Sequence, residues 1–203
     1  MDHIIQPGER ISIDGLAREL EVSQTPIREA LARLESDGLV SRRPLAGYSA
    51  TAVLTLKELM ELYEFRFMIE PRAIEVATKL LTPDGEKRLR NEMNVAKKIS
   101  TGQKYRAYRS LSEHDQRFHS LIVNLSGNSF IEAAYTRAHC HLHLFRLNPT
   151  SPLVQKQAIK EHGLIAEAML SRDSKAAGKT MTTHLQNSRD RILPFIVKNG
   201  EMN

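Results

Sequence analysis

The stretch LARELEVSQTPIREALARLESDGLVSRRPLAGY, residues 16–48, decides the fold of the first quarter of the chain. It predicts a helix, a tight turn, a second helix opened by Ser23, and a short hairpin that carries Arg42, Arg43 and Gly47. This order is typical of a winged helix-turn-helix, which presents one helix to the major groove of DNA and a wing to the adjacent backbone. The first part of the chain is therefore expected to form a DNA-binding domain.

Within this stretch, one face of the second helix is apolar, and Ile27, Ala30, Leu31 and Leu34 are expected to pack on the first helix. Asp14 is a candidate N-cap of the first helix, and Gly38 can end the second because glycine accepts the left-handed conformation. The residues expected to contact DNA are Ser23, Gln24, Thr25 and Arg28 of the helix and Arg42, Arg43 and Gly47 of the wing. The same spacing occurs in helical proteins that never bind DNA, so periodicity alone leaves this function open.

The length and composition of the chain favour a small domain followed by a medium one, or a single large domain. The chain has 203 residues, of which 41% are hydrophobic, which is enough for a true core. No apolar run reaches the length of a membrane span, and the first residues do not have the order of a signal peptide. Cys140 is the only cysteine, which excludes an internal disulfide and suits a reducing cytoplasm.

The charge distribution does not by itself indicate nucleic-acid binding. The formal net charge is +5, but residues 1–53 contain six basic and eight acidic residues and have a net charge of −2. Residues 54–203 therefore contribute +7. The useful signal is local, because Arg28, Arg42 and Arg43 lie where the recognition helix and the wing are expected.

From Thr55 onwards the pattern is helical almost throughout, with Thr55 and Thr82 as candidate caps. Helices are expected over about residues 55–80, 83–99, 105–125, 130–145, 154–170 and 174–197. Six helices with short connections predict an antiparallel, all-helical bundle over residues 54–203. The expected fold class is therefore mostly α, with a winged helix-turn-helix domain over residues 1–53.

Three of these helices carry histidine on an apolar, inward-facing stripe. Asp115 and His119 lie four residues apart on one helix face, and His162 and His184 lie on two further helices. A single inward histidine is usually a buried side chain satisfied by one hydrogen bond, but burying all four polar groups without partners is costly. A divalent metal ion would satisfy them together, and this donor set suits zinc or nickel, with manganese as a further candidate.

A second group of histidines competes for this assignment. His139, His141 and His143 follow one another closely, but on one continuous helix only His139 and His143 share a face. No carboxylate stands at matching spacing, so a surface or partly buried position is expected for this run. Cys140, within it, is expected to be a small buried residue, with a role as a soft ligand as the alternative.

The run VSQTPIREALARLESDGLVSRRPLAGY, together with PGERI at residues 7–11, closely resembles the DNA-binding domain of GntR-type bacterial transcription regulators. The pattern there is V-S-R-T-P-V-R-E-A-L-x-x-L-x-x-x-G-L-V, followed by a wing glycine. Gln24 replaces the usual arginine, which removes a phosphate or guanine contact and allows an adenine-type contact. The family usually has a further helix before PGERI, so either Met1 is not the native start or this domain is trimmed.

The resemblance extends over the rest of the chain. ELYEFRFMIEPRAIEVA, the D-x-x-x-H motif at Asp115–His119, EHGLIAEAML and MTTHL resemble the FadR-type effector domain called FCD. This resemblance implies a metal held by Asp115, His119, His162 and His184, with a small organic acid beside it. We expect Arg66 to supply the charge partner of that effector, the alternative being a structural pair with an interior carboxylate.

The sequence therefore predicts a cytoplasmic, homodimeric transcription regulator, with repression relieved by an effector as the commoner mode in such families. Its partners would be double-stranded operator DNA and a small organic acid, without a membrane. One alternative is a direct metal sensor, in which the ion itself is the signal. Another is a metalloenzyme that activates water, although no general base paired with a nucleophile is evident and the DNA-binding domain would then have no purpose.

Overall fold

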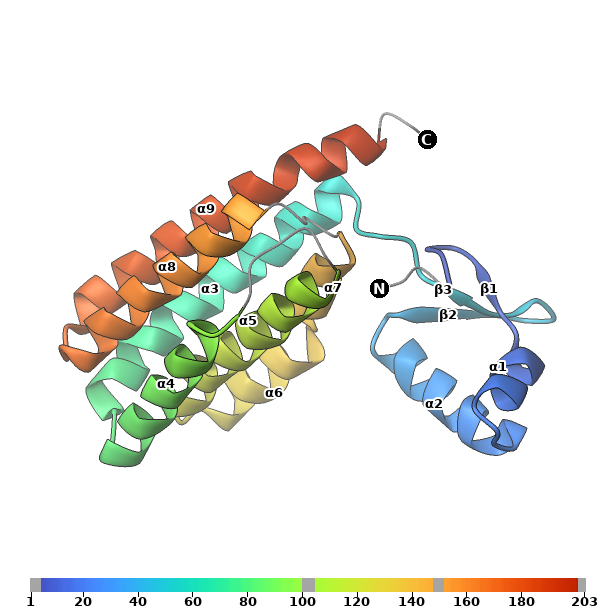
Figure 1. The fold of residues 1–203 in the computed structure, drawn as a ribbon, viewed down its shortest axis with the longest axis horizontal. Helices are drawn as coiled ribbons and strands as arrows, with labels where there is room; N and C mark the ends of the chain where they lie inside the picture. Colours follow the sequence, from blue (N-terminus) through green and yellow to red (C-terminus); the bar gives the residue numbers. More distant parts are fainter. Residues whose placement is uncertain (1–4, 100–104, 148–151, 201–203) are drawn as a thin grey trace. The chain divides into compact units, whose positions relative to one another are not determined.

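A computed structural model describes residues 5–99, 105–147 and 152–200 of the chain. The chain divides into two compact units, Met1–Val53 and Leu54–Asn203 (Figure 1). Met1, on which the expectation about the start of the N-terminal domain depends, lies outside the described residues. Within the described ranges, no helix is both long and apolar enough to cross a membrane.

The N-terminal unit is a small helical pair with a three-stranded antiparallel sheet in the order β1-β3-β2. Its elements along the chain are β1 (Arg10–Ile11), α1 (Ile13–Glu19), α2 (Gln24–Ser36), β2 (Val40–Arg43) and β3 (Gly47–Ala50). Strands β2 and β3 form the expected hairpin, in which Arg43 pairs with Gly47, and β1 adds a strand that the sequence did not indicate. This arrangement is the predicted winged helix-turn-helix.

The core of this unit joins the helices to the sheet through Ile11, Ile27, Leu31, Val40 and Tyr48. Gly38 follows α2 with a φ of 70°, the left-handed conformation expected at a helix end. The N-cap of α1 is Ser12 and not Asp14, since the Ser12 hydroxyl accepts from the Gly15 amide at 3.0 Å. Ser12 has the extended backbone that a cap requires, whereas Asp14 already lies inside the helix.

The C-terminal unit is an all-helical bundle, as predicted. Its elements are α3 (Leu56–Leu80), α4 (Pro83–Ala96), α5 (Tyr105–Leu125), α6 (Ser129–Arg137), α7 (Cys140–Arg146), α8 (Pro152–Leu170) and α9 (Ser174–Gly200). Helix α3 packs against α9 on one side and α5 on another, and α8 packs against α9 and α4 (Figure 1). The largest core cluster draws on α3, α4, α5, α8 and α9, so these helices surround one interior.

Two helix starts follow from local sequence. Thr55 accepts from the Glu58 amide while the Glu58 carboxylate accepts from the Thr55 amide, which is a complete capping box at the start of α3. The Thr82 hydroxyl accepts from the Gly85 amide, and Pro83 occupies the first turn of α4, where no helical hydrogen bond is lost. Both caps were expected from the sequence.

One expected helix is wrong. Residues 130–145 do not form a continuous helix but two short ones, α6 and α7, which are separated at His139. His139 has a φ of 43°, the left-handed conformation, and an α-helix cannot pass through it. The break changes the direction in which every later side chain of the segment points, which matters for His141.

Candidate metal centre, ligand cavity and DNA-binding surface

Four side chains from three helices converge inside the bundle. Asp115 and His119 come from α5, His162 from α8 and His184 from α9, and each offers a ligand atom within 4.8 Å of the others. The three histidines are buried, whereas Asp115 is partly exposed. The three inward stripes anticipated from the sequence therefore meet at one point.

Two of the converging nitrogens have no hydrogen-bond partner. The Nε2 atoms of His119 and His162 are buried and unsatisfied, and Oδ1 of Asp115 lies 3.8 Å and 3.4 Å from them respectively. Buried polar atoms without a partner are costly and rare in folded proteins. Three imidazoles and one carboxylate are a donor set that Zn²⁺ and similar ions accept, so these residues fit a divalent ion.

The opposite edges of two of these histidines are held by carboxylates. Nδ1 of His119 donates to Glu70 Oε2 at 2.6 Å, and Nδ1 of His184 donates to Glu161 Oε2 at 2.8 Å. A proton on Nδ1 leaves the lone pair on Nε2, the atom that faces the cluster. Burial lowers the pKa of His119 to about 4 and also lowers the pKa of His162. Both rings are therefore neutral near neutral pH, as metal ligands must be.

Glu70 is itself held by a buried cation. Nε of Arg66 donates to Glu70 Oε1 at 2.6 Å, and both side chains are 1% exposed. Burial would raise the pKa of Glu70, but the charge of Arg66 and the hydrogen bond from His119 hold it well below its usual value. Of the two interpretations of Arg66 left open by the sequence, this geometry corresponds to the structural pair with an interior carboxylate.

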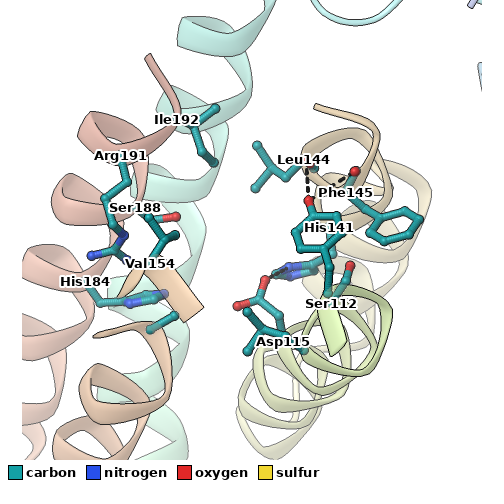
Figure 2. A pocket seen from close by; sticks show the side chains of 13 residues that line it. Ser112, Asp115, His141, Leu144, Phe145, Val154, His184, Ser188, Arg191 and Ile192 are labelled. Atoms are coloured by element: carbon teal, nitrogen blue, oxygen red, sulfur yellow. Dashed lines mark hydrogen bonds and ion pairs between the residues drawn. The ribbon is translucent and has the colours of Figure 1, made fainter. Parts of the chain in front are cut away.

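A cavity adjoins the four-residue cluster. It encloses about 570 Å³ of space, part of which is open solvent at its mouth. Figure 2 shows His184, Ser188 and Arg191 on one wall, facing Ser112, Asp115 and His141 on the other. The apolar part of the lining is formed by Leu111, Leu144, Val154, Ala158 and Ile192, together with the rings of Tyr108 and Phe145. Asp115 and His184 belong to both features, so a molecule in the cavity would touch the cluster.

Arg191, and not Arg66, is the arginine that lines this cavity. Its guanidinium makes a bidentate pair with Glu161, with Nη1 and Nη2 at 2.8 Å and 2.9 Å from the two carboxylate oxygens. Burial would raise the pKa of Glu161, but hydrogen bonds from His184 and Arg191 lower it to about 2. Arg191 was not predicted from the sequence. It lies seven residues after His184, and the search along that helix face looked for apolar residues.

His141 was also missed. The sequence suggested a surface or partly buried position, but His141 is buried and lines the cavity. Its Nδ1 lies 2.5 Å from Asp115 Oδ2, and its Nε2 lies 2.9 Å from the hydroxyl of Tyr135, which donates to Glu70. A hydrogen-bonded chain thus connects Asp115 to the carboxylate behind His119. The left-handed backbone at His139 turns His141 inward, and helical periodicity carries no signal for it.

The residues expected to contact DNA all lie on the exposed surface of the N-terminal unit. Ser23, Gln24, Thr25 and Arg28 are exposed at the start of α2, and Arg42, Arg43 and Gly47 are exposed on the wing. Gln24 is held on both sides: its amide nitrogen lies 2.5 Å from Asp14, and its oxygen accepts from Arg28 at 3.1 Å. Gln24 therefore orients Arg28 in the free protein.

A winged helix-turn-helix followed by an all-helical domain defines a class, the DNA-binding transcription regulators. Residues 1–49 match the family model of bacterial regulatory proteins of the gntR family, and residues 61–187 match that of the FCD domain. The chain belongs to the GntR family, among the members that carry an FCD domain.

Individual relatives agree with this assignment. The chain is 29% identical over 200 residues to the HTH-type transcriptional regulator YdhC of Bacillus subtilis, covering 98% of this chain and 87% of YdhC. A GntR regulator from Rhodococcus sp. RHA1 has a similar fold, with a TM-score of 0.76 at 22% identity, over 95% of this chain and 91% of that one. The metal-free FCD domain of TM0439 matches with a TM-score of 0.58 at 21% identity, over 72% of this chain and 99% of that domain. The chain is thus a transcription regulator and not an enzyme.

Proposed function

We propose that this chain is a regulator of the FadR-type subfamily whose operator affinity is modulated by a small carboxylate bound beside a divalent metal ion. The observation that carries the proposal is the four ligand atoms within 4.8 Å of one another, two of them on buried nitrogens without partners. The likeness to the FCD domain of TM0439, which was solved in a metal-free form, supports the proposal further.

The proposed metal ligands are Asp115, His119, His162 and His184, with zinc or nickel as the preferred ion and manganese as a further candidate. When bound, such an ion supplies positive charge that attracts a carboxylate or hydroxyl oxygen of the effector. Glu70 and Glu161 accept hydrogen bonds from Nδ1 of His119 and His184, so the Nε2 lone pairs of these rings would be available to such an ion. Asp115, whose second oxygen is held by His141, remains fixed at the edge of the cavity.

The proposed effector is a small organic acid. Arg191 supplies the cation that can pair with its carboxylate, and Ser112 and Ser188 supply hydroxyl groups on opposite walls. Because Arg191 is already oriented by Glu161, little side-chain entropy is lost when it binds a ligand. Arg66 would act indirectly, through Glu70 and His119.

Arg191→Ala should remove the stabilisation that carboxylates give to the zinc-loaded protein. Lactate and malonate, compared with lactamide and malonamide, are suitable probes in a thermal-shift assay. An acid that binds should raise the melting temperature by about 5–10 °C at a hundredfold excess over its dissociation constant. Arg189→Ala is the control, because Arg189 lies two residues away and does not line this cavity. Stabilisation by the amides alone, or an undiminished response of Arg191→Ala to the acids, would contradict the proposal.

The proposed DNA contacts are made by Ser23, Gln24, Thr25, Arg28 and the wing residues Arg42, Arg43 and Gly47. Arg28→Ala should weaken operator binding by about 1–3 kcal/mol, because an arginine at the start of a recognition helix contacts bases or phosphates. Gel-shift titration at moderate salt measures this effect. Arg33→Ala, on the last turn of the same helix, should bind nearly as the wild type does. Equal affinities for the wild type and Arg28→Ala would count against this docking.

We also propose that the chain acts as a homodimer in the bacterial cytoplasm, where the operator is found. Two recognition helices would then occupy half-sites about one helical turn, roughly 34–36 Å, apart. An effector changes operator affinity only if it binds the two dimer geometries with different free energies. Footprinting of the operator tests the dimer, since protection of a single half-site would exclude it.

A further inference from the structure

His162 differs from the other two histidines of the cluster in what holds its outer edge. His119 and His184 donate to carboxylates, but Nδ1 of His162 lies 2.9 Å from Nε2 of a fourth histidine, His114. Both His114 and His162 are fully buried. His114 belongs to α5 and directly precedes Asp115, yet it contacts the back of His162 and is not one of the clustered ligands.

The hydrogen bonds of this pair have only one consistent direction when Nε2 of His162 binds a metal. The proton of His162 is then on Nδ1, so Nε2 of His114 must accept a hydrogen bond from it with its own lone pair. His114 consequently carries its proton on Nδ1, which lies 2.7 Å from Glu92 Oε1 on α4. The carboxylate accepts a hydrogen bond from this Nδ1–H group. The series of hydrogen bonds therefore runs from His162 through His114 to Glu92.

The outer end of this chain is fixed from the surface of the bundle. Nε of Arg117 lies 3.0 Å from Glu92 Oε2, and its Nη2 lies 3.1 Å from Oε1. Glu92 is 12% exposed and Arg117 is 47% exposed, so the chain leads from the cluster to solvent across α4 and α5. Phe118 stacks on His162 with ring centroids 4.3 Å apart, which restricts rotation of that ring.

We propose that His114 is a positioning residue for the metal: with Glu92 behind it, it fixes the tautomer and orientation of His162 and thereby raises metal affinity. The inference rests on the proposed metal site. Residues that support a metal ligand in this way are typically worth 10–100-fold in affinity. The Glu92–His114 pair gives His162 the carboxylate support that Glu70 and Glu161 give the other two histidines directly.

The test is zinc affinity of the full chain, measured by competition with a chelator, for His114→Leu and His114→Gln. Leucine fills similar space but cannot accept a hydrogen bond from His162, so His114→Leu should bind zinc about 10–100-fold more weakly than the wild type. The amide oxygen of glutamine can accept from His162, so His114→Gln should recover most of this loss. Arg90→Ala on α4 is the control, because Arg90 pairs with Glu86 and takes no part in the hydrogen bonds between His162, His114 and Glu92.

Each outcome is decisive. Equal zinc affinity of the wild type and His114→Leu would overturn the positioning role, as would equal losses in the leucine and glutamine variants. If His114→Leu does not fold, Glu92→Met decides, because it removes the acceptor at the outer end and should weaken zinc binding severalfold. Unchanged affinity in Glu92→Met would then overturn the inference. A wild-type chain that binds no zinc would instead refute the proposed function itself.

Discussion

Replacing His162 and His184 together with alanine should abolish zinc binding by the full chain. The double variant removes two of the four converging donors, and Asp115 and His119 come from one helix face and cannot enclose an ion alone. The loss should exceed the 10–100-fold that a supporting residue contributes, because these nitrogens are direct ligands. Elemental analysis after zinc loading and dialysis should find one ion per wild-type chain and a small fraction of that in the variant.

The neighbouring histidine pair provides the matched control. His139→Ala combined with His143→Ala removes the same two groups from the competing cluster, and neither residue lies in the four-residue group. This control should retain one ion per chain. Full metal content in the variant of His162 and His184, or its loss only in the control, would refute the assignment of the ligands.

Glu70→Leu should destabilise the metal-free bundle by about 3–5 kcal/mol, because it leaves the guanidinium of Arg66 buried without a counter-charge. Folded domains have only about 5–15 kcal/mol of stability, so this change should remove a large part of it. Denaturant unfolding, followed by a signal from the helical bundle, measures the effect. Arg66→Met combined with Glu70→Leu should recover part of the loss, since no unpaired charge is then buried.

An exposed pair of the same type and spacing gives the comparison. Arg109 and Glu113 also lie four residues apart on a helix, with side chains 64% and 50% exposed. Glu113→Leu should therefore change the free energy of unfolding by less than about 1 kcal/mol. Similar effects of Glu70→Leu and Glu113→Leu would contradict the structural role assigned to the buried pair.

Sequence reasoning was most successful where the signal is local. The helix starts at Thr55 and Thr82 follow from caps within three residues, and the end of α2 follows from Gly38. The four clustered residues were found because each stands on an apolar stripe, and a polar residue at such a position has to be satisfied by something in the interior. Local patterns do not state which helices are neighbours, so the convergence itself was only an expectation.

The parts that the sequence did not predict depend on partners far apart in the chain. Glu70 and Glu161 look like ordinary charged helix residues until α5 and α9 bring His119 and His184 to them. His141 faces the cavity because His139 adopts a left-handed backbone, for which the residue type gives no warning. Arg66 and Arg191 were indistinguishable as charges, and only packing shows that the first meets Glu70 and the second the cavity.

Anomalous diffraction from crystals of the zinc-loaded full chain locates the ion and therefore tests all four proposed ligands at once. One strong peak is expected per chain, about 2.0–2.2 Å from Nε2 of His119, His162 and His184 and from an oxygen of Asp115. A peak beside His139 and His143 instead, or no peak in crystals grown from protein with zinc in excess, would contradict this assignment of the ligands.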